Sequence, residues 1–94
     1  MRRKVTIRNT LGLHARPAAL FVQTATRFKC DVYVERDDIR VSGKSIMGIM
    51  MLAAEQGSQI TIETVGEDAG ECLDVLTELV SSDLEPNRAG TSLE

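Results

Sequence analysis

The chain has 94 residues, with fourteen acidic and eleven basic side chains, a net charge of −3 and 43% hydrophobic residues. This length allows one domain with a core that needs no disulfide bonds. The acidic balance argues against non-specific nucleic-acid binding, which requires a basic face. Basic residues do cluster near the N-terminus. They could form either a solvated face of a strand or a binding patch, and we favour the solvated face. They are Arg2, Arg3, Lys4 and Arg8.

Cysteine usage and hydropathy bear on the cellular compartment. Cys30 and Cys72 form no C-x-x-C motif, so neither a disulfide framework nor a zinc site is expected. The first residues are charged and lack the apolar segment of a signal peptide. The longest apolar stretch, 46–54, is too short to cross a bilayer. We therefore expect a cytoplasmic protein with no membrane insertion, no metal and no cofactor.

The first third of the chain predicts a strand followed by a helix. Residues 3–8 alternate between apolar and polar side chains, as in a half-buried strand, and 9–12 have the composition of a turn. Pro17 suits the first turn of a helix, where its missing N–H costs nothing. The helix is expected over 16–27, because apolar residues recur there at helical spacing. They are Ala18, Phe21, Val22, Ala25 and Phe28.

The remaining residues predict three strands and two helices. Segments 31–35 and 39–42 alternate around a polar break and predict an antiparallel hairpin. Ser45 is a natural N-cap for a short helix, and residues 60–64 read as a fourth strand. The order βαββαβα places helices on one face of a single mixed or antiparallel sheet. The last helix has one apolar face formed by Ala69, Cys72, Leu73, Leu76, Leu79 and Val80.

The stretch 11–18, LGLHARPA, carries the chemistry. His14, the only histidine of the chain, stands just before the first helix. The first backbone N–H groups of a helix have no intrahelical partners, and with the helix dipole they form a phosphate-binding site. Arg16 adds a guanidinium whose planar donors suit phosphate oxygens. These residues favour phosphoryl transfer, in which positioning and charge stabilisation do most of the catalysis.

Another interpretation stays open from these residues alone: His14 merely closes a turn, and the Arg16 side chain is solvated. Hydrolytic catalysis has less support, because the chain has no second histidine or paired base to complete a triad. Among chemical roles, these residues favour a carrier of phosphate over a hydrolytic enzyme, and the turn-closing role of His14 stays open beside it.

Two separated motifs, GLHARPA at 12–18 and GKSIMGIM at 43–50, resemble those of the histidine-containing phosphocarrier (HPr) family of the bacterial phosphoenolpyruvate-dependent phosphotransferase system. The resemblance extends to about residue 84. It implies an α+β open-faced β-sandwich, with a four-stranded antiparallel sheet and three helices on one face. The domain is expected over 1–85, followed by a loose tail over 86–94.

The resemblance also implies roles for three residues. His14 matches the histidine that is phosphorylated on Nδ1, and Arg16 matches the arginine that contacts the phosphoryl group. Ser45 matches a serine that an ATP-dependent kinase phosphorylates in some bacteria. The implied partners of this monomer are enzyme I as donor, an enzyme IIA component as acceptor, and a serine kinase or phosphorylase.

A docking surface for these partners is expected around His14. Methionine surfaces adapt to several partners, and one short helix contains three methionines, although these could instead fill gaps in the core. We expect Ile49 and Leu52 to be buried, and Met47 and Met50 to be partly exposed. The predicted partner-binding residues are Leu13, Ala15, Ala19, Leu20, Gln23, Ile46, Met47 and Met50.

A regulatory binding module of the same fold is the second hypothesis. Such a module would act through phosphorylation of Ser45 instead of transfer. Relatives that took this route lack the histidine, which this chain retains at His14. The resemblance leaves the sugar-uptake and nitrogen-related branches open, because Gln23 and Thr26 stand where sugar-system carriers often have basic residues.

Overall fold

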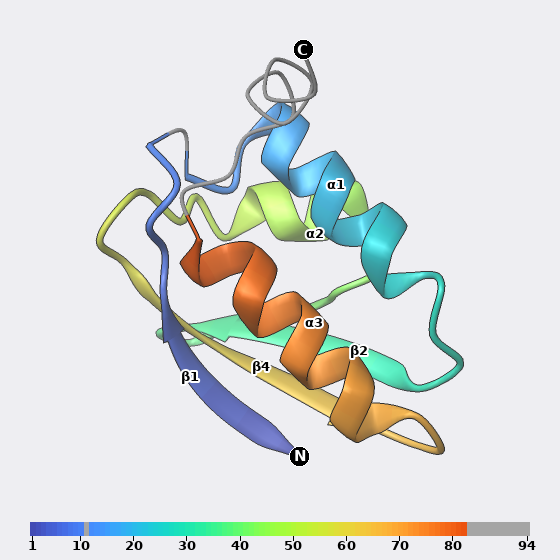
Figure 1. Cartoon of the computed structure of the whole chain (residues 1–94). Helices are drawn as coiled ribbons and strands as arrows, with labels where there is room; N and C mark the ends of the chain where they lie inside the picture. Colours follow the sequence, from blue (N-terminus) through green and yellow to red (C-terminus); the bar gives the residue numbers. More distant parts are fainter. Residues whose placement is uncertain (11, 83–94) are drawn as a thin grey trace, which may run out of the picture.

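The computed structural model describes residues 1–10 and 12–82, and the predicted tail over 86–94 lies outside these residues. One sheet forms a layer, and the helices lie on one side of it (Figure 1). The α+β open-faced sandwich is therefore confirmed. The elements in chain order are β1 (Arg2–Thr6), α1 (Ala15–Ala25), β2 (Asp31–Arg36), β3 (Ile39–Ser42), α2 (Ile46–Met51), β4 (Gln59–Val65) and α3 (Ala69–Ser81).

The strand order is β1-β4-β2-β3, and every neighbouring pair is antiparallel. The predicted hairpin is present, with Val34 of β2 opposite Val41 of β3. The last strand in the sequence, β4, pairs with both β1 and β2 and so occupies the interior of the sheet. This pairing brings the residues that precede β4 next to those that follow β1.

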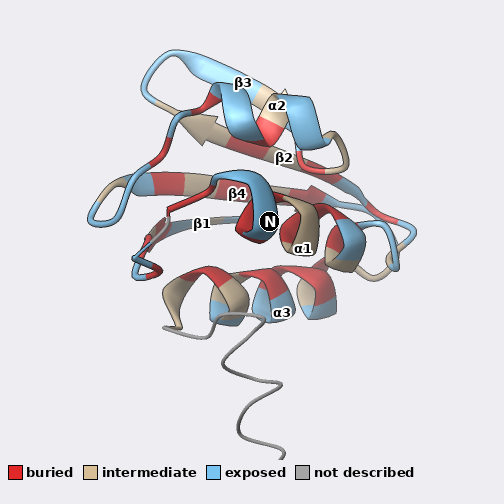
Figure 2. Cartoon of the chain, turned by 90° about the horizontal axis from the view of Figure 1, so that it is seen from above, coloured by how far each residue is buried: buried red, intermediate tan, exposed pale blue. Residues whose placement is uncertain are grey.

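The core lies between the sheet and the buried faces of the helices (Figure 2). On β4, Ile60, Ile62 and Thr64 point inward, as the alternation predicts. The hydroxyl of Thr64 is buried and donates to the carbonyl oxygen of Ala69 at 2.9 Å, so its burial leaves no unpaired group. The predicted apolar faces of α1 and α3 are buried except for Phe28 and Leu79, which are partly buried against the core.

Two predicted boundaries differ from the structure. The first strand ends at Thr6 rather than at residue 8, although Ile7 still donates from its backbone N–H to Ser58 at 2.9 Å. The first helix ends at Ala25 rather than at 27. Phe28 then donates to the carbonyl oxygen of Ala25 in a tighter turn, which keeps its side chain against the core. Helix ends often tighten in this way, and apolar spacing alone does not locate them.

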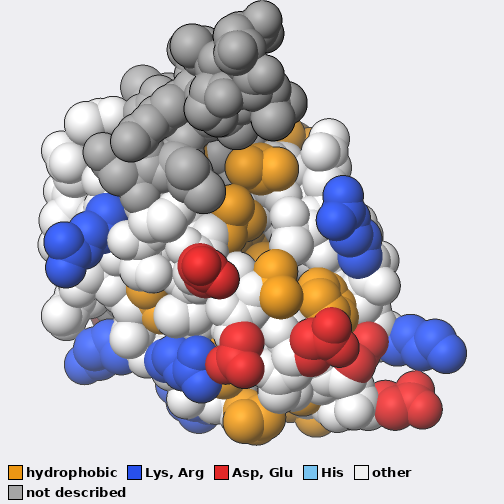
Figure 3. Space-filling model, in the orientation of Figure 1, with side chains coloured by type: hydrophobic (Ala, Val, Ile, Leu, Met, Phe, Trp, Pro, Cys, Tyr) orange, Lys and Arg blue, Asp and Glu red, His pale blue; other side chains and the backbone are white. Residues whose placement is uncertain are grey.

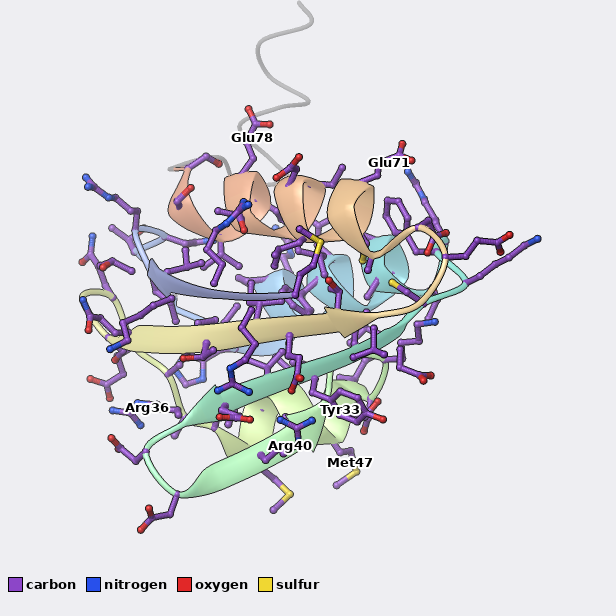
Figure 4. The ribbon with its side chains drawn as sticks, turned by 90° about the horizontal axis from the view of Figure 1, so that it is seen from below. Tyr33, Arg36, Arg40, Met47, Glu71 and Glu78 are labelled. Atoms are coloured by element: carbon purple, nitrogen blue, oxygen red, sulfur yellow. The ribbon has the colours of Figure 1, made fainter. Side chains whose placement is uncertain are left out.

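Charged side chains cross the outer face of the sheet, opposite the helices. Arg2 of β1 lies 3.1 Å from both Glu35 of β2 and Glu63 of β4. Arg40 of β3 contacts the same two carboxylates and stacks 4.3 Å from the ring centroid of Tyr33 (Figure 4). Hydrogen bonds from Arg2 and Arg40 hold the pKa of Glu35 below its ordinary value. These side chains are partly exposed, so each pair contributes little stability individually.

The early basic cluster is thereby explained in part. Arg2 pairs across the sheet, and Arg3 lies 3.0 Å from Asp74 of α3. Both guanidiniums are neutralised by acidic neighbours, which agrees with a solvated strand face rather than a free basic patch.

Candidate phosphoryl-carrier site

His14 is the N-cap residue of α1 and is exposed. Its backbone is extended, with φ −97° and ψ −161°, and its carbonyl oxygen accepts from the N–H of Ala18 at 2.6 Å. The imidazole makes no capping hydrogen bond to the helix. The ring nitrogens are therefore accessible from solvent, beside the N-terminus of an eleven-residue helix.

Arg16 lies in the first turn of the same helix and is exposed. Its guanidinium forms no ion pair with any residue that the structure describes. No acidic side chain occupies the first turn of α1. An anion on the imidazole of His14 would therefore meet unpaired N–H groups, the positive end of the helix dipole and a guanidinium in one region.

The loop before His14 is fixed by the segment that follows α2. The N–H of Leu13 donates to the carbonyl oxygen of Ala54 at 2.9 Å, and that of Gly12 donates to Asn9 at 2.9 Å. Gly12 has a φ of +64°, which favours glycine, and a Cβ there would lie 2.5 Å from the same Ala54 oxygen. The sequence GLH therefore allows a close approach between two backbones that any larger residue would block.

The position of Leu13 corrects one prediction. Leu13 was expected to extend the exposed patch around His14, but its side chain is only 4% exposed and belongs to the core. It lines a small apolar cavity of about 20 Å³ together with Pro17, Leu20 and Phe21. The backbone hydrogen bond to Ala54 holds the loop so that the Leu13 side chain lies in the core. Leu13 therefore anchors the loop of His14, and its side chain is not available for docking.

An open hollow of about 430 Å³ lies beside His14. The sequence does not predict the other residues that line it. Thr10 comes from the loop after β1, whereas Glu55 and Gln56 come from the loop before β4. The amide of Gln56 donates to the carbonyl oxygen of Arg8 at 3.2 Å, which joins the two loops. Only the pairing of β1 with β4 brings these segments together, so no local sequence signal could have identified them.

The residues predicted for the docking surface on α1 are placed along one exposed side of the helix. Ala15 and Gln23 are exposed, and Ala19 and Leu20 are half-buried. Leu20 also lines the small apolar cavity, so only part of its side chain is available to a partner.

Ile49 of α2 and the C-cap residue Leu52 are fully buried, whereas Met47 and Met50 are 75% and 42% exposed, as predicted. Ile46 is exposed as well. The predicted docking residues of this helix therefore all reach the surface.

Ser45 is the N-cap of α2, as its position in the sequence predicts. Its side-chain oxygen accepts from the N–H of Gly48 at 3.0 Å, and its carbonyl oxygen accepts from Ile49. Lys44, the preceding residue, donates from Nζ to the carbonyl oxygen of Phe28 at 2.8 Å. Ser45 is half-buried and stands where the exposed methionine helix begins.

Within residues 1–10 and 12–82, no three His, Cys, Asp or Glu side chains are grouped so that they could hold a metal ion. Over the same residues, no helix is long and apolar enough to span a membrane. Several acidic side chains lie over α3 in the space-filling view, with Lys and Arg side chains beside them (Figure 3).

The fold and this site define a class of small open-faced α+β domain that presents a single exposed histidine at a helix N-terminus. Residues 1–82 match the family model described as the HPr component phosphorylation site of the phosphotransferase system (PTS). The chain therefore belongs to the HPr family.

Relatives and solved structures agree with this membership. Phosphocarrier protein HPr of Neisseria meningitidis is 49% identical over 81 residues, covering 86% of this chain and 91% of that protein. The crystal structure of HPr from Bacillus anthracis has 51% identity and a TM-score of 0.83, covering 85% of this chain and 95% of that one. The HPr-like protein Crh of Bacillus subtilis is 46% identical over 84 residues, covering 89% of this chain and 99% of Crh.

Proposed function

We propose that this chain is a phosphocarrier that accepts a phosphoryl group on His14 from enzyme I and passes it to an enzyme IIA component. The observation that supports this most directly is the exposed, uncapped imidazole of His14 at the N-terminus of α1. Similarity to several phosphocarrier proteins adds support.

The transfer divides into two displacements at phosphorus. In the first, a lone pair on an imidazole nitrogen of His14, Nδ1 by the family resemblance, forms an N–P bond while the bond from phosphorus to the donor breaks. In the second, an acceptor side chain attacks phosphorus and the imidazole leaves neutral. Arg16 and the first N–H groups of α1 stabilise the charge on the phosphoryl oxygens in both steps. The chain returns unchanged, so it acts as a carrier rather than a catalyst.

Radiolabelled phosphoenolpyruvate with purified enzyme I tests the proposal. We expect one acid-labile phosphate per chain, its transfer to enzyme IIA, and complete loss of labelling in His14→Ala. Asp38→Ala, at an exposed position between β2 and β3, serves as the matched control and should label normally. Label that persists in His14→Ala would refute the assignment.

A regulatory module acting through Ser45 is the second candidate, and the similarity to the HPr-like protein Crh favours keeping it. A phosphate on Ser45 would add a charge of about −2 where α2 begins and would disfavour acidic or apolar partner surfaces. The two functions are separated by His14→Ala: a pure regulatory module would keep its phosphorylation on Ser45 and its partner binding in that variant.

The proposal extends to the setting of the protein. We place it in the cytoplasm as a monomer, with a serine kinase or phosphorylase acting on Ser45. One Crh crystal structure shows a domain-swapped dimer and another structure is of an HPr dimer, so the oligomeric state is tested directly by light scattering.

A further inference from the structure

Three of the four methionines of the chain lie in the six residues of α2. Met47, Met50 and Met51 are 75%, 42% and 66% exposed. Ile49, in the same helix, is fully buried and packs into the core, so the helix is anchored by one face while the three thioethers stay at the surface. Met47 projects outward beyond the edge strand β3 (Figure 4).

These thioethers are neighbours on the helix surface. Met47 and Met50 are three residues apart, and Met47 and Met51 are four apart, so their side chains share a side of the helix. The three methionines lie in the helix that follows Ser45 directly, and the segment after this helix holds the loop of His14 through the bond from Leu13 to Ala54.

We propose that α2 is an oxidation site, at which a peroxide converts the exposed methionines to sulfoxides and thereby weakens the docking of phosphotransfer partners. This inference rests on the proposed function and on the predicted docking surface, to which Ile46, Met47 and Met50 of α2 belong. Each thioether sulfur attacks the peroxide O–O bond and takes one oxygen; the sulfur is oxidised, and the peroxide is reduced to water or an alcohol.

The consequence for docking follows from polarity. A thioether is flexible and apolar and adapts to a partner, whereas a sulfoxide is polar and needs a hydrogen-bond partner when it is buried in an interface. The fold itself should not suffer, because none of the three side chains belongs to the core. The change is reversible: a methionine sulfoxide reductase returns the thioether and water at the expense of two thiols, which become a disulfide.

The other sulfur atoms of the chain provide the controls. Cys30 and Cys72 are buried, so a mild peroxide meets the methionines first. Met1 is 61% exposed and lies beside Gly70 in the first turn of α3, away from α2. The combined variant Met47→Leu, Met50→Leu, Met51→Leu therefore restricts methionine oxidation to Met1, so its difference from the wild-type protein reports oxidation of α2 alone.

The wild-type protein and the combined variant are treated with hydrogen peroxide, and their intact masses are measured. The wild-type protein should gain four oxygen atoms, one for each of its four methionines, and the combined variant one, with helix content unchanged by circular dichroism. Phosphoryl transfer from enzyme I is then measured at increasing carrier concentration. The oxidised wild-type protein should require roughly tenfold more carrier for half-maximal transfer, the order expected when a polar group is buried without a partner.

Three outcomes are distinguished. The inference is supported if the oxidised combined variant transfers normally and reductase treatment restores the oxidised wild-type protein. It is overturned if the fully oxidised wild-type protein transfers as well as the untreated protein, or if the three methionines of α2 resist oxidation. If the untreated wild-type protein accepts no phosphate at all, the proposed function fails and the inference falls with it.

Discussion

The backbone N–H of Leu13 donates to the carbonyl oxygen of Ala54 at 2.9 Å, and this bond ties the loop of His14 to the segment after α2. The first residues of α1 and the short helix α2 are thus held in a fixed relation, although they are far apart in sequence. The two proposed phosphorylation sites, on His14 and Ser45, flank this connection. The hydrogen bond between Leu13 and Ala54 should therefore affect both the stability of the fold and the rate of phosphoryl transfer.

Gly12→Ala tests this connection. A Cβ on Gly12 would lie 2.5 Å from the Ala54 oxygen, and the φ of +64° disfavours any larger residue. We expect a loss of unfolding free energy above about 1 kcal/mol, and slower transfer because the His14 loop must shift. Gly57→Ala is the control, since its φ is +91° but nothing lies within 4 Å of its Cβ. Equal losses in urea titrations of the two variants would show that the close approach has no energetic consequence.

Arg16→Glu is expected to slow phosphoryl transfer strongly, because it replaces a cation beside the phosphoryl oxygens with an anion. Thermal stability should change little, since Arg16 is exposed and has no ion pair among the described residues. Arg27→Glu, at an exposed position just after α1, reports the effect of a general charge change. A large drop in the melting temperature of Arg16→Glu alone would indicate a structural role instead.

Substitutions of Ser45 should separate capping from regulation. Ser45→Ala removes the acceptor for the Gly48 N–H and should cost about 0.5–2 kcal/mol of unfolding free energy. Ser45→Asp keeps a good N-cap and adds a negative charge, so it should stay near the wild-type stability but bind enzyme I more weakly. Calorimetric binding with unchanged affinity for Ser45→Asp would remove the regulatory role.

Asp68 makes stability depend on pH in the acid range. Its carboxylate accepts from the N–H groups of Lys29 and Cys30, each at 2.9 Å, and these bonds, that of Lys29 first, hold its pKa below the ordinary 3.8. The folded protein therefore releases this proton more readily than the unfolded chain. The stabilisation is present above the ordinary pKa and is lost as pH falls through the lower folded-state value.

Asp68→Asn should accordingly lower the melting temperature at neutral pH, and its difference from the wild-type protein should shrink on acidification below the ordinary pKa of 3.8. Asp74→Asn, whose ion pair with Arg3 is largely exposed, should show a small difference at every pH. A difference for Asp68→Asn that is independent of pH would mean that packing, rather than ionisation, explains the effect.

The thiols should be unreactive in the folded protein. Burial raises the pKa of Cys72 to about 12 and also raises that of Cys30, so neither forms much thiolate near neutral pH. Iodoacetamide at about pH 8 should leave both unmodified in the native state and alkylate both in denaturant, as read by mass spectrometry. Rapid native alkylation would show that the contact between α3 and the start of β2 opens readily.

The sequence alone determined the elements and the residues at the centre of the candidate site. Alternation of period two and apolar spacing of three to four residues predicted the strands and helices, because these periods reflect which side chains face the core. The sequence also predicts Ser45 as an N-cap and His14 with Arg16 as a candidate phosphate site, because capping and anion binding at a helix N-terminus depend on residues next to one another in the chain.

Tertiary structure decided what depends on contacts between distant segments. The interior position of β4 is one example, since strand order is not contained in any local pattern. That position brings Glu55 and Gln56 beside His14, and the bond from Leu13 to Ala54 turns the Leu13 side chain into the core. A short-range signal identifies an apolar residue next to the site, but only long-range backbone pairing fixes which way its side chain points.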